Sequence, residues 1–426
     1  MDNKDINPIN SHSIFSGIIK TKKNATKLLS NQIKENSFIR MDISHLTQRK
    51  AMSRESLSTI YYTGLIDSRY PTEQQQRKHS IYKHLSHFRQ FINKDIPFVI
   101  NNTTLASIHV EHIDYRVFSP ETIIFSICID NKKKVLDDIT LQNSIISRVS
   151  FYNKSPKYQL SEEFLNLFQN LFTLTDTKNE YSIDNLTHKL FQGNKLYNYL
   201  LVQVEDNVEN FDDLLYELSC NTNIGMLQDS NNFLYPDSNF KNQLMANNSI
   251  ACYNNWKGLV LTDTTCILMK KSVGEDRYFD GKCLYFEFLY MNVFYLKAYL
   301  VMLNKKYQSE NLTKKLKAEY LAFERAFNFH NISYNFLPQL IYDRLRFGME
   351  INDELQQLKD KINLFNEKIE RDSDKWLNII VLFLTLISVI SGINDFFELQ
   401  NKFDWWACTP IPFLILIFIL MIKRIK

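Results

Sequence analysis

Two uncharged apolar runs near the carboxyl end limit what this chain can fold into. Residues 376–393 and residues 405–422 are each 18 residues long and contain no charged side chain. A helix of this length is about long enough to cross the hydrocarbon core of a bilayer. The second run is apolar on every helical face, which disfavours a pair of buried core helices. We therefore predict a transmembrane hairpin with spans at 376–393 and 405–422.

Charges beside the two spans predict their orientation. Lys368, Arg371 and Lys375 precede the first span, and the basic residues 423–426 follow the second. The link 394–404 is acidic. Because cytoplasmic flanks carry an excess of Lys and Arg, we expect a multi-pass protein with both ends in the cytoplasm.

The first span carries a polar stripe that the second lacks. Asn378, Thr385, Ser388 and Gly392 follow steps of three and four residues from Asp374, which places them on one helical face. Polar groups in hydrocarbon usually face water or other helices. Since one helix cannot enclose water, we expect a homo-oligomer with this stripe lining a pore. Helix packing through small polar residues, without a pore, is the alternative.

A stalk helix is predicted to run into the first span, because residues 349–375 contain neither Gly nor Pro. Asp360 and Glu367 continue the polar stripe toward Asp374 and would form acidic rings around a symmetry axis, which favour cations. A solvated coiled-coil face is the alternative. The apolar residues keep a heptad seam: Ile351, Leu355, Leu358, Ile362, Phe365, Ile369 and Trp376.

The remaining chain is predicted to be an α+β cytosolic domain. Strand-forming clusters occur within 97–130, 199–204 and 258–269, and the Asn-rich residues 221–255 indicate loops. Helices are expected at 77–93, 161–172 and 211–219. The predicted divisions are a basic N-terminal extension at 1–54, a ligand-sensing domain at 55–283, a helical bundle and stalk at 284–375, and the hairpin at 376–426.

Residues 284–306 predict a long aromatic helix that hydropathy alone would class as a third span. Glu287, Lys297 and the tyrosine hydroxyls argue against that assignment. A second, amphipathic helix is expected at 309–331, and Pro338 is predicted to mark the start of the stalk. We expect these helices to pack around the stalk.

The first 100 residues are basic, with 16 Lys and Arg against 8 Asp and Glu. This excess suggests an anionic partner, with a plain solvated face as the alternative. Within the helix predicted at 77–93, Arg77, Lys78, Lys83 and Arg89 are the candidate anion-binding residues. His84 and His87, one helical turn apart, make a metal site conceivable, but no nearby ligand completes it.

Motifs of enzyme chemistry are absent from the sequence. It contains no glycine-rich phosphate loop, no G-x-S-x-G, no H-E-x-x-H and no C-x-x-C pair. We therefore expect neither an enzyme nor a covalent cofactor, and the six dispersed cysteines indicate free thiols in a reducing cytosol.

The C-terminal region resembles the CorA family of magnesium transporters. Gly392-Ile393-Asn394 stands where the family has a G-M-N motif at the end of its first span, Asp395 and Glu398 follow, and the tail is KRIK. The resemblance implies a homo-oligomer, typically a pentamer, whose first span lines the pore. It also implies that Asn394 contacts a hydrated Mg²⁺ or other cation, and that Thr385 lines the pore.

In overall plan the chain resembles a branch of CorA-like proteins that is associated with type III CRISPR systems. Ile393 in place of Met and the basic first quarter fit that branch. That resemblance implies an antiviral effector of the bacterial inner membrane, gated by a nucleotide second messenger. The leading hypothesis is thus a ligand-gated cation channel with no direct nucleic-acid binding. A housekeeping transporter of divalent cations and a non-conducting, membrane-anchored binding protein are the alternatives.

Overall fold

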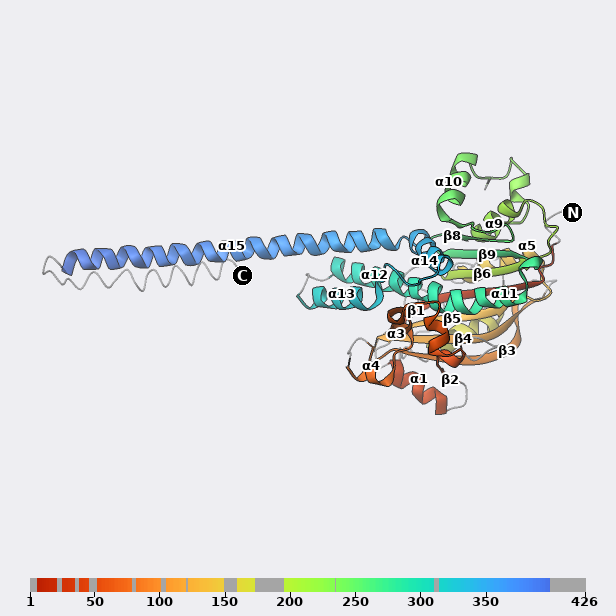
Figure 1. Ribbon diagram of the computed structural model, residues 1–426, viewed down its shortest axis with the longest axis horizontal. Helices are drawn as coiled ribbons and strands as arrows, with labels where there is room; N and C mark the ends of the chain where they lie inside the picture. Colours follow the sequence, from red (N-terminus) through yellow and green to blue (C-terminus); the bar gives the residue numbers. More distant parts are fainter. Residues whose placement is uncertain are drawn as a thin grey trace. The chain divides into compact units, whose positions relative to one another are not determined.

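The computed structural model describes residues 6–20, 25–34, 38–45, 52–78, 82–100, 105–119, 122–148, 159–172, 195–233, 235–309 and 314–398. The chain divides into two compact units, residues 1–357 and residues 358–426. The first unit is an α+β fold built on one mixed sheet, which agrees with the predicted fold class at that level (Figure 1).

The sheet of the first unit has the strand order β2-β3-β4-β5-β1-β6-β9-β8-β7. Every neighbouring pair is antiparallel except β6 and β9, which are parallel. The strands are β1 (Asn10–Lys20), β2 (Phe38–Met41), β3 (Ser86–Ile100), β4 (Leu105–Ser119), β5 (Thr122–Asp130), β6 (Tyr197–Val204), β7 (Ser249–Ile250), β8 (Trp256–Val260) and β9 (Thr264–Lys270).

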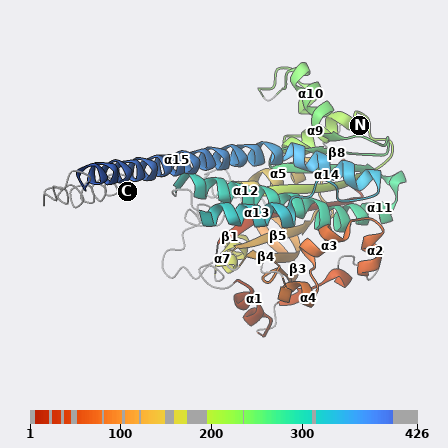
Figure 2. The same ribbon diagram turned by 60° about the vertical axis from the view of Figure 1, so that its left-hand side comes forward.

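Helices cover both faces of this sheet (Figure 2). The helices of the described chain are α1 (Ala25–Lys34), α2 (Arg54–Ser58), α3 (Thr63–Arg69), α4 (Glu73–Lys78), α5 (Leu136–Ser147), α7 (Glu162–Phe172), α9 (Phe211–Cys220), α10 (Ser238–Asn248), α11 (Glu275–Asp280), the π-helix η6 (Gly281–Tyr290), α12 (Met291–Ser309), α13 (Lys314–Phe327), α14 (Phe336–Gly348) and α15 (Ile351–Glu398). Short 3₁₀ turns are η2 (Ile43–His45), η4 (Met226–Gln228) and η5 (Lys271–Val273).

Alternation of side chains between bulges in the central strands gives the sheet two different faces. In β4, Ile113, Tyr115 and Val117 join one apolar core cluster together with residues of α1, α5 and α7. The intervening residues of β4, among them Asp114 and Arg116, are also buried, but on the opposite face. Both faces are therefore covered, and only one of them is apolar.

The polar face is covered by the aromatic helix that hydropathy would class as a membrane span. Within the described residues, one helix is long and apolar enough to cross a membrane, Glu275–Asn304, and 83% of its most apolar window is buried in the fold. Glu287 and Lys297, the two charges that argued against a span, are both buried against protein partners. Burial against the sheet is the arrangement of a core helix.

Several predicted elements are confirmed, including strands at 97–100, 199–204 and within 258–269, and helices at 161–172 and 211–219. The helix predicted at 77–93 is wrong, because α4 ends at Lys78 and β3 begins at Ser86. The Asn-rich loop prediction is also wrong in part, since α10 forms there behind an Asp237 cap. Pro338 lies in the first turn of α14, not at the start of the stalk.

The long helix α15 runs unbroken for 48 residues, which corresponds to about 70 Å at 1.5 Å per residue. Its predicted apolar seam is buried at Ile351, Leu355, Leu358 and Ile362. Farther along, Ile369 is exposed. The predicted second span, 405–422, lies outside the described residues.

Replacing Gly348 by Ala should destabilise the first unit by about 1–3 kcal/mol, because overpacked cores cost that much. A Cβ at this position would lie 2.5 Å from both the Val260 carbonyl oxygen and a Val260 methyl group. Gly64→Ala is the matched control, since its Cβ would meet only the Phe329 ring edge at 3.3 Å. Denaturant unfolding of both variants measures the difference, and equal stabilities would contradict this packing.

Candidate functional site

The predicted pore residues lie on α15 with their side chains exposed. Asp374, Asn378, Thr385, Ser388 and Gly392 are all exposed, as are Asp360 and Glu367 of the predicted acidic rings. The Thr385 and Ser388 hydroxyls donate to the carbonyl oxygens of Val381 (2.7 Å) and Leu384 (2.9 Å). Ile393 and Asn394 are helical, and α15 continues past the predicted end of the span at 393 to Glu398.

The predicted anion-binding residues separate into two groups. Arg77 and Lys83 line a hollow of about 440 Å³ together with Arg40, Glu73 and Gln76. Arg77 forms an exposed ion pair with Glu73 at 3.2 Å. Lys78 is exposed at the end of α4. The structure thus brings two of the four predicted anion-binding residues, Arg77 and Lys83, to one surface hollow.

Arg89 and His87 are not on that surface, because they belong to β3 and point to the buried polar face of the sheet. The Arg89 guanidinium donates to both carboxylate oxygens of Asp114, at 2.6 and 2.8 Å. Its charge is therefore satisfied inside the fold, and its assignment to an anion-binding helix is wrong. The same strand assignment removes the helical spacing on which a His84–His87 metal site depended.

Asp114 and Glu287 are the centre of a buried charge network that the sequence did not predict. Arg116 donates to Asp114 at 3.0 Å and to both oxygens of Glu287 at 2.6 and 2.7 Å. Arg89 lies 3.7 Å from Glu287. Because the two arginines neutralise the two carboxylates, the network joins β3 and β4 to η6 without leaving net charge.

A second part of the network lies on the same face, around Glu111 of β4. The Lys282 ammonium of η6 donates to Glu111 at 2.8 Å, and the Cys128 thiol donates to it at 3.0 Å. His12 of β1 lies 3.3 Å from Glu111 and 2.7 Å from the Tyr278 hydroxyl. Strands β1, β3, β4 and β5 thus all contribute polar side chains to the network on this face.

Three groups of side chains here are spaced closely enough to hold a metal: Glu111, His112 and Cys128; His12, Glu111 and Asp130; and His87, Asp114 and Glu287. The carboxylates in these groups already form ion pairs with lysine and arginine side chains of the protein. Lys282 contacts Glu111, and two arginines contact Asp114. A metal ion would have to displace them or accept their repulsion, so this donor set fits a structural network better than a cation site.

Burial sets the pKa values in this network. It lowers the pKa of His87 to about 4 and that of His112 to about 3, because the charged imidazolium loses its hydration. Burial would raise the pKa of Asp114, but Arg89 and Arg116 hold it well below its ordinary value. Both histidines are therefore neutral at pH 7, and the carboxylates are ionised.

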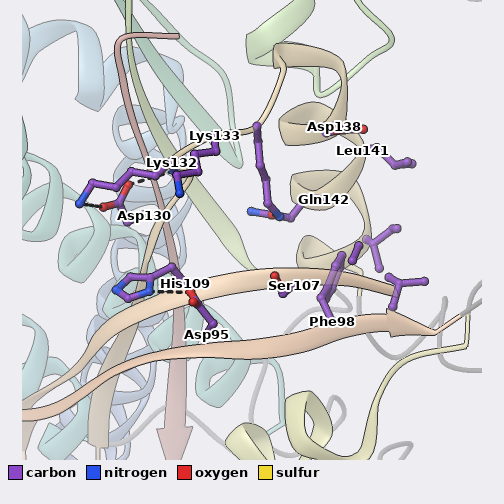
Figure 3. A pocket seen from close by; sticks show the side chains of 14 residues that line it. Asp95, Phe98, Ser107, His109, Asp130, Lys132, Lys133, Asp138, Leu141 and Gln142 are labelled. Atoms are coloured by element: carbon purple, nitrogen blue, oxygen red, sulfur yellow. Dashed lines mark hydrogen bonds and ion pairs between the residues drawn. The ribbon is translucent and has the colours of Figure 1, made fainter. Parts of the chain in front are cut away.

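A separate pocket of about 770 Å³ lies between α5 and the ends of β3 and β4 (Figure 3). Three consecutive lysines, Lys132, Lys133 and Lys134, line it where β5 turns into α5. Lys132 pairs with Asp130 at 2.8 Å, and His109, the neighbour of Asp130 on the adjacent strand, pairs with Asp95 at 2.8 Å. The sequence signal that would have located it is the run of three lysines directly after a buried strand.

Buried amides hold the lysine-bearing turn in place. Asn131 donates to Ser11 at 3.1 Å and to Ser13 at 2.8 Å, and it accepts from Gln142 at 2.9 Å. Gln142 in turn accepts a hydrogen bond from the Lys134 ammonium. This chain from β1 to α5 fixes Lys134 in the wall of the pocket.

No protein-family model, curated protein or solved structure matches this chain.

Replacing Glu287 by Gln should lower the free energy of unfolding by about 3–5 kcal/mol, because Arg116 would remain buried with part of its charge unpaired. The matched control is Glu205→Gln, which removes an exposed pair with Lys271 and should cost less than about 1 kcal/mol. Denaturant unfolding gives both values. Similar losses in the two variants would show that the network contributes no more than a surface pair.

Stability should fall with acidification through the pH range from about 6.5 to 4. The unfolded chain protonates its histidines near their ordinary pKa of 6.5, whereas folded His87 and His112 stay neutral to about 4 and 3. The unfolded state therefore binds more protons in this range and gains stability as pH falls. His112→Gln should flatten the unfolding midpoint against pH, and an unchanged slope would contradict the assignment.

Proposed function

We propose that this chain forms a homo-oligomeric cation channel of a bacterial inner membrane, opened or closed by a ligand that binds its sheet domain. The observation that carries the proposal is the composition of α15. This one helix begins with charged, partly buried turns and continues into a segment with exposed apolar side chains, including Leu377 (56% exposed), Val381 (58%) and Leu384 (57%).

Such exposed apolar surface is unfavourable in water and suits hydrocarbon. The hydroxyls of Thr385 and Ser388 bond within their own helix, which is how polar side chains are tolerated in a membrane span. They lie on the same stripe as Asn378 and Gly392. A polar stripe within an apolar span supports a pore formed by several copies of the helix.

The start of α15 is tied to the sheet domain by a buried cation. Lys297 of α12 lies 3.5 Å from Glu354 and 3.6 Å from Glu350, and Asn304 of α12 donates to Glu354 at 2.6 Å. A ligand that shifts α12 would therefore act on the first turns of α15. Gating needs such an element, because a ligand biases a conformational equilibrium only through differential binding to two states.

The double replacement Thr385→Val and Ser388→Ala should reduce cation flux in proteoliposomes severalfold, because it removes the hydroxyls of the proposed pore and keeps their approximate volumes. The matched control is Ile380→Val with Ile387→Val, on the other face of the helix, which should leave flux close to that of the parent protein. Equal losses in both would contradict a pore along this stripe.

Two alternatives give different results in the same assay. Steady magnesium flux that cytosolic magnesium inhibits would favour a housekeeping transporter. No flux of any cation, with the protein still inserted in liposomes, would favour a non-conducting anchored binding protein. Replacing Asn394, Thr385 and Asp374 together then separates them further, because only a conducting protein should respond.

A further inference from the structure

Lys134 is a half-buried cation in the lining of the pocket shown in Figure 3. Among the described residues, its ammonium donates to the neutral amide oxygen of Gln142, and no carboxylate lies within ion-pair distance. Burial lowers the pKa of Lys134 to about 8, because the charged form has lost hydration and the nearby Asp138 carboxylate offsets this loss only in part. A cation in this state gains more from an anionic ligand than a surface lysine does.

The two neighbouring lysines extend the positive charge to the rim of the pocket. Lys133 is exposed and has a left-handed backbone with φ of 61°, an uncommon conformation for a non-glycine residue, so the turn directs three consecutive lysines around one corner. Lys132 remains exposed beyond its pair with Asp130. Three carboxylates line the same pocket. Asp95 is paired with His109 and Asp130 with Lys132, whereas Asp138 acts on Lys134 from beyond ion-pair distance.

The opposite wall of the pocket is apolar. Phe98, Val99, Leu141 and Ile145 line it, and Leu141 is 43% exposed. A free inorganic anion would use only the lysine corner and leave this wall in contact with water. An anionic group attached to a flat or apolar body would use both, and a volume of about 770 Å³ accommodates such a molecule.

From this geometry we propose that the pocket between α5 and the β3–β4 ends binds a small organic phosphate, with the phosphate at Lys134 and Lys133 and its apolar body against Phe98 and Leu141. Lysine suits this role as a point charge for phosphate oxygens. This pocket would supply the ligand class and the binding site of the channel proposed above. A role of the pocket in gating rests on that proposed function. Binding itself does not require a conducting pore.

The test is calorimetric titration of the full-length protein in detergent with AMP, which joins one phosphate to an aromatic body. Inorganic phosphate and adenosine serve as the two halves of the probe. AMP should bind at least about tenfold more tightly than either half. Absence of AMP binding at millimolar concentration, or equal affinity for inorganic phosphate, would overturn the proposal.

Lys134→Met should weaken AMP binding by about tenfold or more. It should preserve the thermal unfolding midpoint, because it replaces a desolvated charge with an apolar side chain of similar length. Lys133→Gln should weaken AMP binding by a smaller factor. Because Lys133 is exposed, this replacement should not disturb folding, so weaker binding by this variant cannot be attributed to misfolding. Lys83→Met is the matched control in the hollow beside α4. Weakening by Lys83→Met alone would place the site there and overturn the proposal.

The pH dependence of binding separates a direct contact from a structural role. AMP needs the protonated Lys134, so above pH 8 its Kd should rise by up to about tenfold per pH unit. This rise should be absent in Lys134→Met. If the two proteins show the same pH profile, Lys134 does not contact the phosphate. Because the assay records no ion flux, it gives its answer whether or not the channel proposal holds.

Discussion

Asp114 and Glu287 are carboxylates removed from water, and the attachment of the helices to the polar face of the sheet depends on the arginines that neutralise them. A buried charge without a partner costs several kcal/mol. Arg116 lies between the two carboxylates and contacts both. The network therefore fixes how η6 lies on β4, since a shift of this helix would separate buried charges. It specifies position more than it adds stability.

The same principle operates where the sheet domain meets the long helix. Lys297 of α12 is buried, and its partners Glu350 and Glu354 lie at the start of α15. The aromatic helix Glu275–Asn304 thus has charged contacts on the sheet through Glu287 and on α15 through Lys297. One core helix thus connects the polar face of the sheet with the element proposed to carry a signal into the membrane.

The lysine pocket and the charge network differ in a way that matters for function. Around Asp114, Arg89 and Arg116 each have a carboxylate partner, so these charge pairs are complete without a ligand. At Lys134 the hydrogen-bond acceptor is a neutral amide and the Asp138 carboxylate acts only from a distance, so the positive charge is balanced only in part and can still bind an anionic ligand. Complete networks hold a fold together, whereas an incomplete one next to a cavity is where affinity for a charged molecule can arise.

Sequence periodicity alone determined the alternation of β4, the helix α9 and the seam at the start of α15, because these patterns follow from local geometry. It also identified Glu287 and Lys297 as unsuited to a membrane. It did not predict β1, which lies within the part assigned only to a basic N-terminal extension, or the strand at Arg89, where basic residues suggested a surface helix. Those elements form because distant residues neutralise them: Asp114 for Arg89, and Glu111 with Tyr278 for His12. Only the tertiary structure decides such pairings, since the partners are far apart in the chain and a charge is favourable inside a protein only where its counter-charge is brought to it.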